Sequence, residues 1–514
     1  MLRKLRVTYL IIVSIIIATT SISAPKAQTN VGVDYSLPRS TPAAEGVNAQ
    51  KLARLFNNLA TTGKPVNTIL IVKNGKIIAE AYKYPYGPQY KRQLFSVTKS
   101  IISILIGIAI NDGLFKGVDE HMVDIFNDRK IKYLDERKRK TTLHDYLSMQ
   151  AGIDWQNDKV NLNMYDAFEQ MINSSDPTQY VLDLPAHIDP GTGFFYHNGV
   201  SHLLSAAIQK RARKSTFDYA QEKLFTPLGI SDVYWAADKL GTTHGAFGLY
   251  LLPEDMAKIG QLMLNNGAFN NQQIVPAAWV KQSTRKQTKN SFLNDNDGYG
   301  YQWWVNKDTF FGRGSGGQYI IVVPKLKLVA VFCSNLTGED EDWELPEILF
   351  NLYVTPAVTG KGSLAADKYL ANAIAAYEQK PKAKKVTYSL PAQSIDGAEY
   401  LIEDNSTISF AISSPGEISA TWEVGNKEYN VIVGLDGVER INQLASFSQP
   451  ELASAMSAIG HFDEHTLIAR LTWLNGADDL IMTMDFSKDQ PVWEILAALN
   501  NKRVMGRLTG VKKN

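Results

Sequence analysis

Two residues one helical turn apart, Ser96 and Lys99, could together open an ester or an amide bond. A serine hydroxyl is a poor nucleophile at neutral pH and needs a base within hydrogen-bonding reach. A lysine amine can be that base where burial or a neighbouring positive charge lowers its pKa. Positions i and i+3 share one face of a helix, so this spacing brings the two groups together. A serine at a helix start also directs backbone N–H groups at a developing oxyanion.

The Ser-x-x-Lys spacing alone is a weak signal, because the chain also contains it at Ser23–Lys26 and Ser283–Lys286. Only Ser96 is followed by an apolar run, residues 101–110, that would bury the base. The competing interpretation is that Ser96 caps a helix while Lys99 faces solvent. Further segments must decide between the two.

A second polar group follows about one hundred residues downstream, in the segment PGTGFFYHN at 190–198. It contains Tyr196 and Asn198, and Tyr-x-Asn occurs nowhere else in the chain. The phenol could share a proton relay, and the amide of Asn198 could hold the lysine or the substrate. The alternative for Tyr196 is an ordinary loop aromatic packed on the core.

A third segment, GRGSGGQ at 312–318, is rich in glycine. Gly312, Gly314 and Gly317 match G-x-G-x-x-G, but they precede a strand and no helix follows to bind a pyrophosphate, so a dinucleotide site is excluded. Glycine beside a strand permits close approach of the backbone to a ligand. We therefore expect this edge to supply an N–H group to an oxyanion.

Taken in order, these segments resemble the motifs of the serine β-lactamase/penicillin-binding superfamily, near the class C β-lactamase-like esterases and nylon-oligomer hydrolases. Ser96-x-x-Lys99 matches the first motif and Tyr196-x-Asn198 the second. The third motif is usually Lys-Thr-Gly or His-x-Gly, whereas this chain has Gly314-Ser315-Gly316 without the basic residue. The resemblance covers residues 40–355 and includes framework segments at 143–155, 247–267 and 274–280.

The resemblance implies a role for each matched residue. Ser96 would be the acylated nucleophile, Lys99 would take its proton, and Tyr196 would relay that proton to the leaving group. Asn198 would support the site, and the amides of Ser96 and Ser315 would form the oxyanion hole, with Gly316 or Gly317 as alternatives for the second amide. This chemistry requires no metal and no other cofactor.

Three functions follow from these residues. The leading one is an exported serine hydrolase acting on a small-molecule or peptide-like ester or amide. The second is a cell-wall D-alanyl-D-alanine carboxypeptidase or endopeptidase, or a β-lactamase; the missing basic residue weighs against it, although Arg313 could substitute from one position away. The third is a catalytically silent binding protein of the same fold, against which the intact Ser96, Lys99 and Tyr196 argue.

The elements that must position these groups can be read from the pattern of apolar residues. Residues 67–83 form two β-rich runs around Asn74-Gly75, a strong hairpin signal. Residues 95–112 favour one long helix, residues 114–290 are mostly helix and loop, and residues 298–335 return to strands. Strands at both ends of a helical middle predict an α+β domain: one antiparallel sheet flanked by helices, with a helical subdomain, as in β-lactamase-like folds.

A charged segment with one proline, KPKAKK at 380–385, divides the chain. We expect a β-lactamase-like hydrolase domain over residues 35–380. Alternating apolar residues over 386–514 predict a C-terminal all-β domain, a barrel or a sandwich. It loosely resembles the lipocalin-like domain appended to some such hydrolases, and its residues indicate no particular function.

Composition and the first residues limit the partners, disulfides and location that can be expected for the protein. Among 514 residues, Lys+Arg is 53 and Asp+Glu is 52, so a net charge of +1 gives no reason to expect a nucleic-acid partner. Cys333 is the single cysteine, which excludes an intrachain disulfide. A basic start, a short apolar run and small residues up to Ala27 are typical of a signal peptide over 1–27. We expect a periplasmic or secreted protein with no stable membrane anchor beyond that peptide; the oligomeric state is left open.

Overall fold

The structure is a computed structural model of the chain. It describes residues 35–153, 155, 164–289, 298–336, 344–358, 363–386, 395–402, 406–414, 416–425, 427–444, 454–476, 479–487, 492–499 and 502–513. The signal peptide expected over residues 1–27 lies outside the described residues. Within them, no helix combines the length and the apolar composition needed to cross a membrane.

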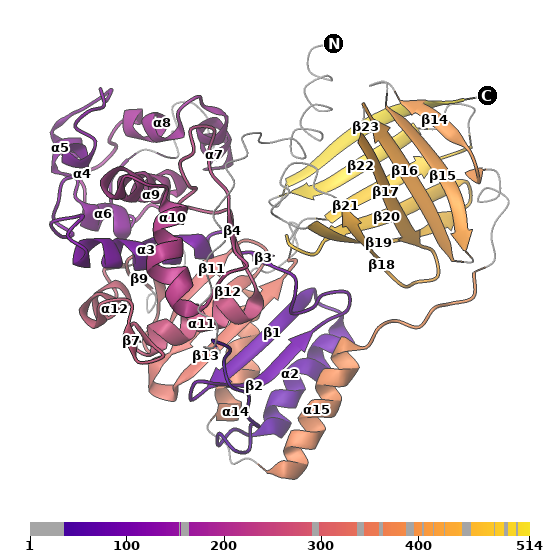
Figure 1. Cartoon of the computed structure of the whole chain (residues 1–514), viewed down its shortest axis with the longest axis horizontal. Coiled ribbons are helices and arrows are strands. Elements are labelled where there is room, and N and C mark those ends of the chain that lie inside the picture. Colours follow the sequence, from indigo (N-terminus) through magenta and orange to yellow (C-terminus); the bar gives the residue numbers. More distant parts are fainter. Residues whose placement is uncertain are drawn as a thin grey trace.

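Strands from both ends of the hydrolase body share one antiparallel sheet, in the order β2-β1-β13-β12-β11-β10-β9-β8 within the described residues (Figure 1). Their bounds are β1 Val66–Lys73, β2 Lys76–Tyr82, β8 Thr288–Lys289, β9 Gly298–Tyr299, β10 Trp304–Val305, β11 Phe310–Gly314, β12 Gln318–Val323 and β13 Leu328–Ser334. β1 pairs with β13, which joins the early strands to the late ones. The prediction of an α+β body whose sheet is built from both ends is confirmed.

One face of this sheet is covered by α2 (Ala49–Thr62) and α15 (Leu364–Glu378), which lie side by side (Figure 1). The other face packs against α3 (Val97–Asn111) and α11 (Pro253–Leu264). Each face has its own apolar cluster, so β12 and β13 are buried along their whole length. This double cover explains why these strands show continuous apolar runs instead of alternation.

The helix that carries Ser96 is enclosed on every side. α3 is buried from Val97 to Ala109, because a helical subdomain covers the side that faces away from the sheet. The other helical elements of this part of the chain are α4 Met122–Ile125, α5 Glu136–Lys140, α6 Leu143–Leu147, α7 Met164–Asn173, α8 Pro177–Asp183, α9 Asn198–Ala212, α10 Thr216–Ala220, η1 Gln221–Phe225, η2 Thr226–Leu228 and α12 Ala277–Ser283. The remaining ones are β3 Arg92–Gln93, β4 Tyr234–Trp235, β5 Leu249–Leu251, β6 Ala268–Phe269, β7 Gln272–Gln273, η3 Pro324–Leu326, α13 Leu345–Leu349, η4 Phe350–Val354 and α14 Thr355–Val358.

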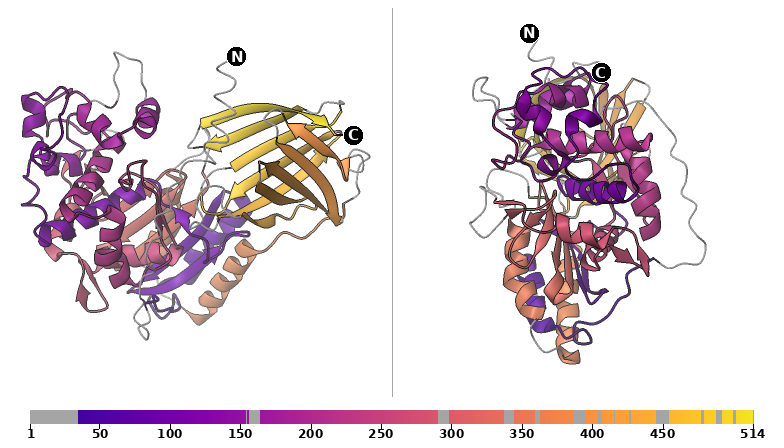
Figure 2. Two further views of the ribbon diagram at one scale, coloured as in Figure 1. Left: turned by 45° about the horizontal axis from the view of Figure 1, so that its top comes forward. Right: turned by 90° about the vertical axis from the view of Figure 1, so that its left-hand side faces the viewer.

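The C-terminal part of the chain is all β, as expected. Within the described residues its strands form one curled sheet in the order β17-β16-β15-β14-β23-β22-β21-β20-β19-β18, and β17 also meets β19 at Gly434 and Ile459 (Figure 2). It is therefore a single sheet closing on itself, not a sandwich of two. The bounds are β14 Glu399–Ile402, β15 Thr407–Ser414, β16 Glu417–Val424, β17 Lys427–Gly434, β18 Arg440–Leu444, β19 Ser454–Asp463, β20 Thr466–Trp473, β21 Asp479–Asp485, β22 Val492–Leu499 and β23 Lys502–Lys512.

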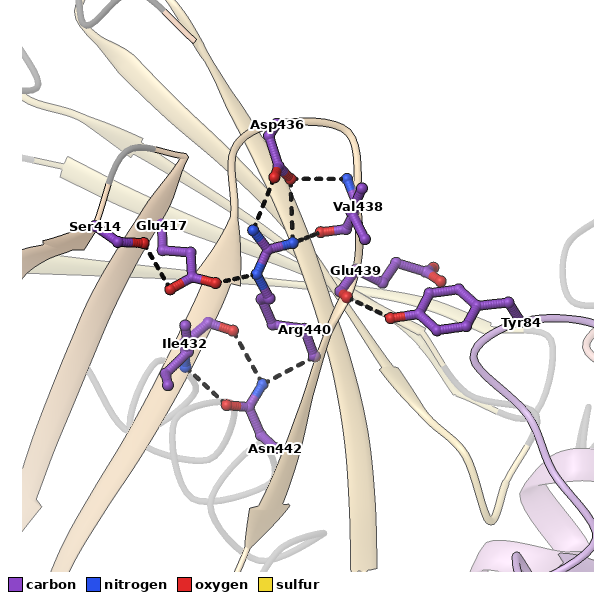
Figure 3. A network of polar contacts seen from close by, with 9 residues as sticks. All are labelled: Tyr84, Ser414, Glu417, Ile432, Asp436, Val438, Glu439, Arg440 and Asn442. Atoms are coloured by element: carbon purple, nitrogen blue, oxygen red, sulfur yellow. Dashed lines mark hydrogen bonds and ion pairs between the residues drawn. The ribbon is translucent and has the colours of Figure 1, made fainter. Parts of the chain in front are cut away.

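A polar network stiffens the loop between β17 and β18, where this sheet contacts the hydrolase body (Figure 3). The guanidinium of Arg440 binds Asp436 at 2.9 Å and also pairs with Glu417. The same ion pair holds the pKa of the Glu417 carboxyl below its usual value. Beside this network, the hydroxyl of Tyr84 in the hydrolase body donates to the carbonyl of Glu439 at 2.8 Å.

Candidate active site

Ser96 is the N-cap residue of α3, directly after a strained residue, and its side chain makes no capping hydrogen bond. Phe95 adopts φ +46°, a left-handed conformation that costs energy for a bulky residue and persists only where the surroundings impose it. The turn is held by Val97 N–H donating to Leu94 O at 3.1 Å and by Lys99 N–H donating to Ser96 O at 3.1 Å. The nucleophile candidate is therefore presented by a fixed strand-to-helix corner.

The glycines of β11 make that corner possible. A Cβ atom on Gly314 would lie 2.3 Å from Leu94 O, and one on Gly312 would lie 3.0 Å from Val97 Cγ1. A larger residue at Gly314 would push β11 away from the backbone before Ser96, and one at Gly312 would press on the side chains of Val97 and Ser100. Gly312 and Gly314 thus allow close approach of the chain to itself, and the expectation that this edge also approaches a ligand stays a prediction.

Lys99 is the centre of the polar contacts. Its Nζ lies 2.9 Å from Ser96 Oγ, 2.8 Å from Asn198 Oδ1 and 3.1 Å from the carbonyl oxygen of Ala246. Only 1% of its surface is exposed. Asn198 is the first residue of α9, so the two motifs that are a hundred residues apart meet through the ends of two packed helices. The alternative of a solvent-facing Lys99 is wrong.

Burial favours the neutral form of this lysine. Desolvation penalises the ammonium form and holds the pKa of Lys99 well below its usual value. A neutral amine has two N–H donors and one lone pair. The oxygens of Asn198 and Ala246 can only accept, so they take the two N–H groups, and the lone pair is left for the hydroxyl proton of Ser96. The geometry therefore suits Lys99 as a base toward Ser96.

Tyr196 lies on the same cluster. Lys99 Nζ is 4.8 Å from the centre of its ring, and Ser96 is close enough to influence the pKa of its hydroxyl. Burial raises the pKa of Tyr196 to about 12, although the neighbouring Ser96 hydroxyl and the charge of Arg313 oppose the rise. At neutral pH the phenol is therefore protonated and able to donate.

An aromatic wall holds this phenol in place. Trp304 stacks on Tyr196 with ring centres 5.6 Å apart and planes tilted by 22°. Its neighbour Trp303 is fully buried against Phe310 in the sheet core. One of two adjacent tryptophans faces the site and the other the core, as the alternation of side chains along a strand predicts.

The turn after β11 carries the remaining candidates. Ser315 is half-buried, and Gly316 and Gly317 adopt φ +71° and +81°, which glycine tolerates best. The carbonyl of Gly316 accepts from Leu336 N–H at 3.1 Å, which ties the turn to the end of β13. The turn follows Gly314 and so lies at the end of β11 that contacts the corner before Ser96. That its amides serve an oxyanion stays a prediction.

His197 belongs to the framework of the site. It caps α9, its Nδ1 accepting from Val200 N–H at 3.2 Å, and its ring packs on Trp155 at 4.1 Å. Burial lowers the pKa of His197 to about 3, so the ring is neutral. Throughout the described part of the chain, His, Cys, Asp and Glu form no group of three or more that could hold a metal ion.

Two contributors have no signature in the sequence. The contact of Lys99 with Ala246 uses a backbone carbonyl, which any residue type supplies. Arg92 is buried four residues before Ser96 and bonds to residues far along the chain. Its presence in an otherwise ordinary polar segment gave no reason to single it out.

Comparison with known proteins places the site in a family. A family model described as Beta-lactamase matches residues 52–349, which include all the residues named above from Ser96 to Gly317. A 6-aminohexanoate-dimer hydrolase of Paenarthrobacter ureafaciens is 23% identical over 325 residues, covering 59% of this chain and 81% of that one. A Salmonella typhimurium protein provisionally assigned as a D-alanyl-D-alanine carboxypeptidase is 22% identical over 362 residues, covering 57% and 80%.

A solved structure shows the same fold. It is a Bacillus anthracis protein provisionally assigned as a 6-aminohexanoate-dimer hydrolase, with a TM-score of 0.53, 20% identity, and coverage of 65% of this chain and 89% of that one. The family match ends before α15 and does not include the curled C-terminal sheet.

Proposed function

The chain belongs to the beta-lactamase family and is a serine hydrolase of that fold, and from this premise we propose that it cleaves an ester or an amide through an acyl-enzyme on Ser96. One observation carries the proposal: the amine of a fully buried lysine, Lys99, lies 2.9 Å from Ser96 Oγ with its other two contacts to pure acceptors. Burial of the amine and a free lone pair are what a base toward a serine needs.

In the acylation step, Ser96 Oγ attacks the carbonyl carbon of the substrate and its proton passes to Lys99 Nζ. The new ammonium is stabilised by the oxygens of Asn198 and Ala246. The oxyanion accepts from the amide of Ser96 and from that of Ser315, or of Gly316 or Gly317 in its place. Loss of one such donor costs about 10²- to 10³-fold in rate.

Collapse of the tetrahedral intermediate breaks the bond to the leaving group, and Tyr196 donates its proton to the departing nitrogen or oxygen. Lys99 then returns a proton to Tyr196, so both groups regain their resting forms. A water molecule repeats the sequence on the acyl-enzyme and releases the acid. Tyr196 suits the donor role, because its raised pKa of about 12 keeps the phenol protonated at neutral pH.

A cell-wall carboxypeptidase or β-lactamase is the second candidate, and one observation favours it. The guanidinium of Arg313 lies 5.7 Å from the ring of Trp304, which itself stacks on Tyr196, so a positive charge is close to the site. Glu344 pairs with this guanidinium at 3.1 Å and competes for it with a substrate carboxylate. Ester or amide hydrolysis without carboxylate recognition is therefore the better-supported function. From the sequence of residues 1–27 we also propose export to the periplasm or the medium.

Active-site labelling tests the proposal. The full chain is incubated with a fluorophosphonate and, separately, with a fluorescent penicillin, and the adduct is mapped by peptide mass spectrometry, with Ser96→Ala as the control. Labelling of Ser96 by the fluorophosphonate alone supports an esterase or amidase, and labelling by both probes supports the cell-wall function. A folded protein that reacts with neither probe is a silent binding protein, and the proposal is then wrong.

A further inference from the structure

The C-terminal sheet contacts the hydrolase body at the segment that leads into Ser96. The turn after β20 contains Leu474 and Asn475, both buried. The carbonyl of Asn475 accepts from Gln93 N–H at 2.6 Å, and the carbonyl of Leu474 accepts from Arg92 Nη1 at 2.7 Å. Arg92 and Gln93 form β3, which Figure 1 shows on the side of the body that faces the C-terminal sheet.

The guanidinium of Arg92 also binds a third part of the chain. Its Nη2 donates to Asn335 Oδ1 at 2.7 Å and to the carbonyl of Ser334 at 3.3 Å. Only 1% of Arg92 is exposed, and Tyr86 covers one face of the guanidinium at 4.7 Å. Because its planar fork fixes several donors at once, one side chain sets the spacing between β3, the turn after β20 and the end of β13.

The end of β13 holds the turn that carries the oxyanion candidates. Gln318 Nε2 donates to Ser334 O at 2.6 Å, and Leu336 N–H donates to Gly316 O at 3.1 Å. A Cβ atom on Gly317 would lie only 2.6 Å from Leu336 Cδ1, so the turn and the strand end are packed tightly. A displacement of Ser334 therefore moves the amides of this turn.

The other side of Arg92 leads to the nucleophile. From Arg92 the chain continues through Leu94 and the strained Phe95 to Ser96. Leu94 N–H donates to Leu249 O at 2.8 Å, and its carbonyl packs on Gly314. Arg92 is thus bonded directly to the C-terminal domain. It is linked along the chain to Ser96 and through Ser334 to the amides of the turn at 315–317, and in the proposed reaction both must face the same substrate carbonyl carbon.

We propose that Arg92 is a positioning residue, through which the docked C-terminal domain fixes Ser96 relative to the glycine turn at 315–317. This inference rests on the proposed acyl-enzyme chemistry. A side chain that cannot bridge the three segments lets the strained corner relax, and a displacement of the order of 1 Å can cost about 10²-fold in rate. In this role the domain outside the family match is a part of the catalytic apparatus and not an independent appendage.

The test compares the full chain with Arg92→Met, Arg92→Lys and Tyr84→Phe. Tyr84→Phe is the matched control, because it removes another bond from the hydrolase body to a backbone carbonyl of the C-terminal domain and leaves β3 untouched. For each variant, fluorophosphonate labelling gives two separate values: the fraction of molecules that react, and the limiting rate constant of those that do. A purely structural residue changes the fraction, whereas a positioning residue changes the rate constant.

We expect Arg92→Met to react fully but with a limiting rate constant lowered about 10²-fold, Arg92→Lys to be intermediate, and Tyr84→Phe to stay within about two-fold of the parent. An unchanged rate constant in Arg92→Met, a smaller reactive fraction alone, or an equal loss in Tyr84→Phe overturns the inference. If Arg92→Met does not fold, a parental rate constant in Arg92→Lys overturns it. A parent chain that does not label at all reports failure of the proposed function instead.

Discussion

Replacing Lys99 by methionine tests the acid–base assignment and its thermodynamic consequence in one variant. Methionine keeps the length of the side chain but has no amine, so Ser96 loses its proposed base while the buried volume is nearly conserved. Loss of a general base lowers a rate by about 10²- to 10⁴-fold, which corresponds to about 3–5 kcal/mol in activation free energy. We expect fluorophosphonate labelling of Ser96 to slow by that factor.

The same variant should change how stability depends on pH. Burial lowers the pKa of Lys99 in the folded chain, whereas in the unfolded chain it titrates near pH 10.4. Between these two values the unfolded state holds one more proton, so the free energy of unfolding rises with pH by about 1.4 kcal/mol per unit. Lys99→Met removes this contribution, and its stability should rise less steeply over about pH 8.5 to pH 10.

Lys138 supplies the control for this measurement. It is also buried, it donates to the carbonyl oxygens of Leu182 and Lys132, and desolvation lowers its pKa to about 8. Lys138→Met should therefore lose a similar slope over the same pH range but keep the parental labelling rate. Denaturant unfolding at several pH values, together with the labelling time course, measures both effects in each variant.

Two results would refute the reasoning. Labelling of Lys99→Met at the parental rate would show that another group takes the proton from Ser96. A slope lost in Lys138→Met but retained in Lys99→Met would show that Lys99 is charged in the folded protein, and a charged amine has no lone pair for the serine proton.

Three further changes probe the neighbours of the pair. Tyr196→Phe should slow acylation by about 10²-fold or more, and because burial raises the pKa of Tyr196 to about 12, the labelling rate of the parent should show no fall from tyrosine ionisation between neutral pH and about pH 11; such a fall would argue against the protonated phenol. Gly314→Ala should lower stability by about 1–3 kcal/mol and slow labelling at least tenfold in a stopped-flow assay, because its Cβ would stand 2.3 Å from Leu94 O. Gly312→Ala should cost less, since its Cβ meets the movable side chains of Val97 and Ser100 at 3.0 Å and 3.1 Å; a larger loss at Gly312 would contradict the steric argument.

Local patterns were sufficient for the elements of the hydrolase body. Asn74 and Gly75 do adopt positive φ between β1 and β2, and α3 follows the apolar run after Ser96. The helix spacing also predicted that Ser96 and Lys99 lie close together, because the helix itself fixes the relative positions of residues i and i+3. The approach of Asn198 to Lys99 could not follow from periodicity, since it depends on how two helices pack. The family resemblance supplied it.

Contacts made by the backbone could not be predicted from the sequence, for a different reason. Ala246 acts through its carbonyl, and Gly314 acts by the absence of a side chain, so neither residue type reveals its neighbour. Arg92 reaches Leu474, which lies 382 positions further along the chain. A contact between two domains depends on how their surfaces fit together, and no short window of sequence contains that information.

In the proposed mechanism, burial makes the amine of Lys99 reactive, and the same burial lowers the stability of the folded chain. Desolvation moves the pKa of Lys99 down and that of Tyr196 up, so burial favours the neutral form of both groups, in which the hydroxyl of Ser96 would be flanked by one acceptor and one donor without net charge. In the proposed reaction, charge develops only during acylation, as an oxyanion and an ammonium inside a poorly solvated site where their attraction is strong. A lysine exposed to water would stabilise the fold more at neutral pH and would be useless as a base. The pH dependence of stability and the rate of acylation should therefore both depend on the buried amine of Lys99. Replacing Lys99 should reduce both.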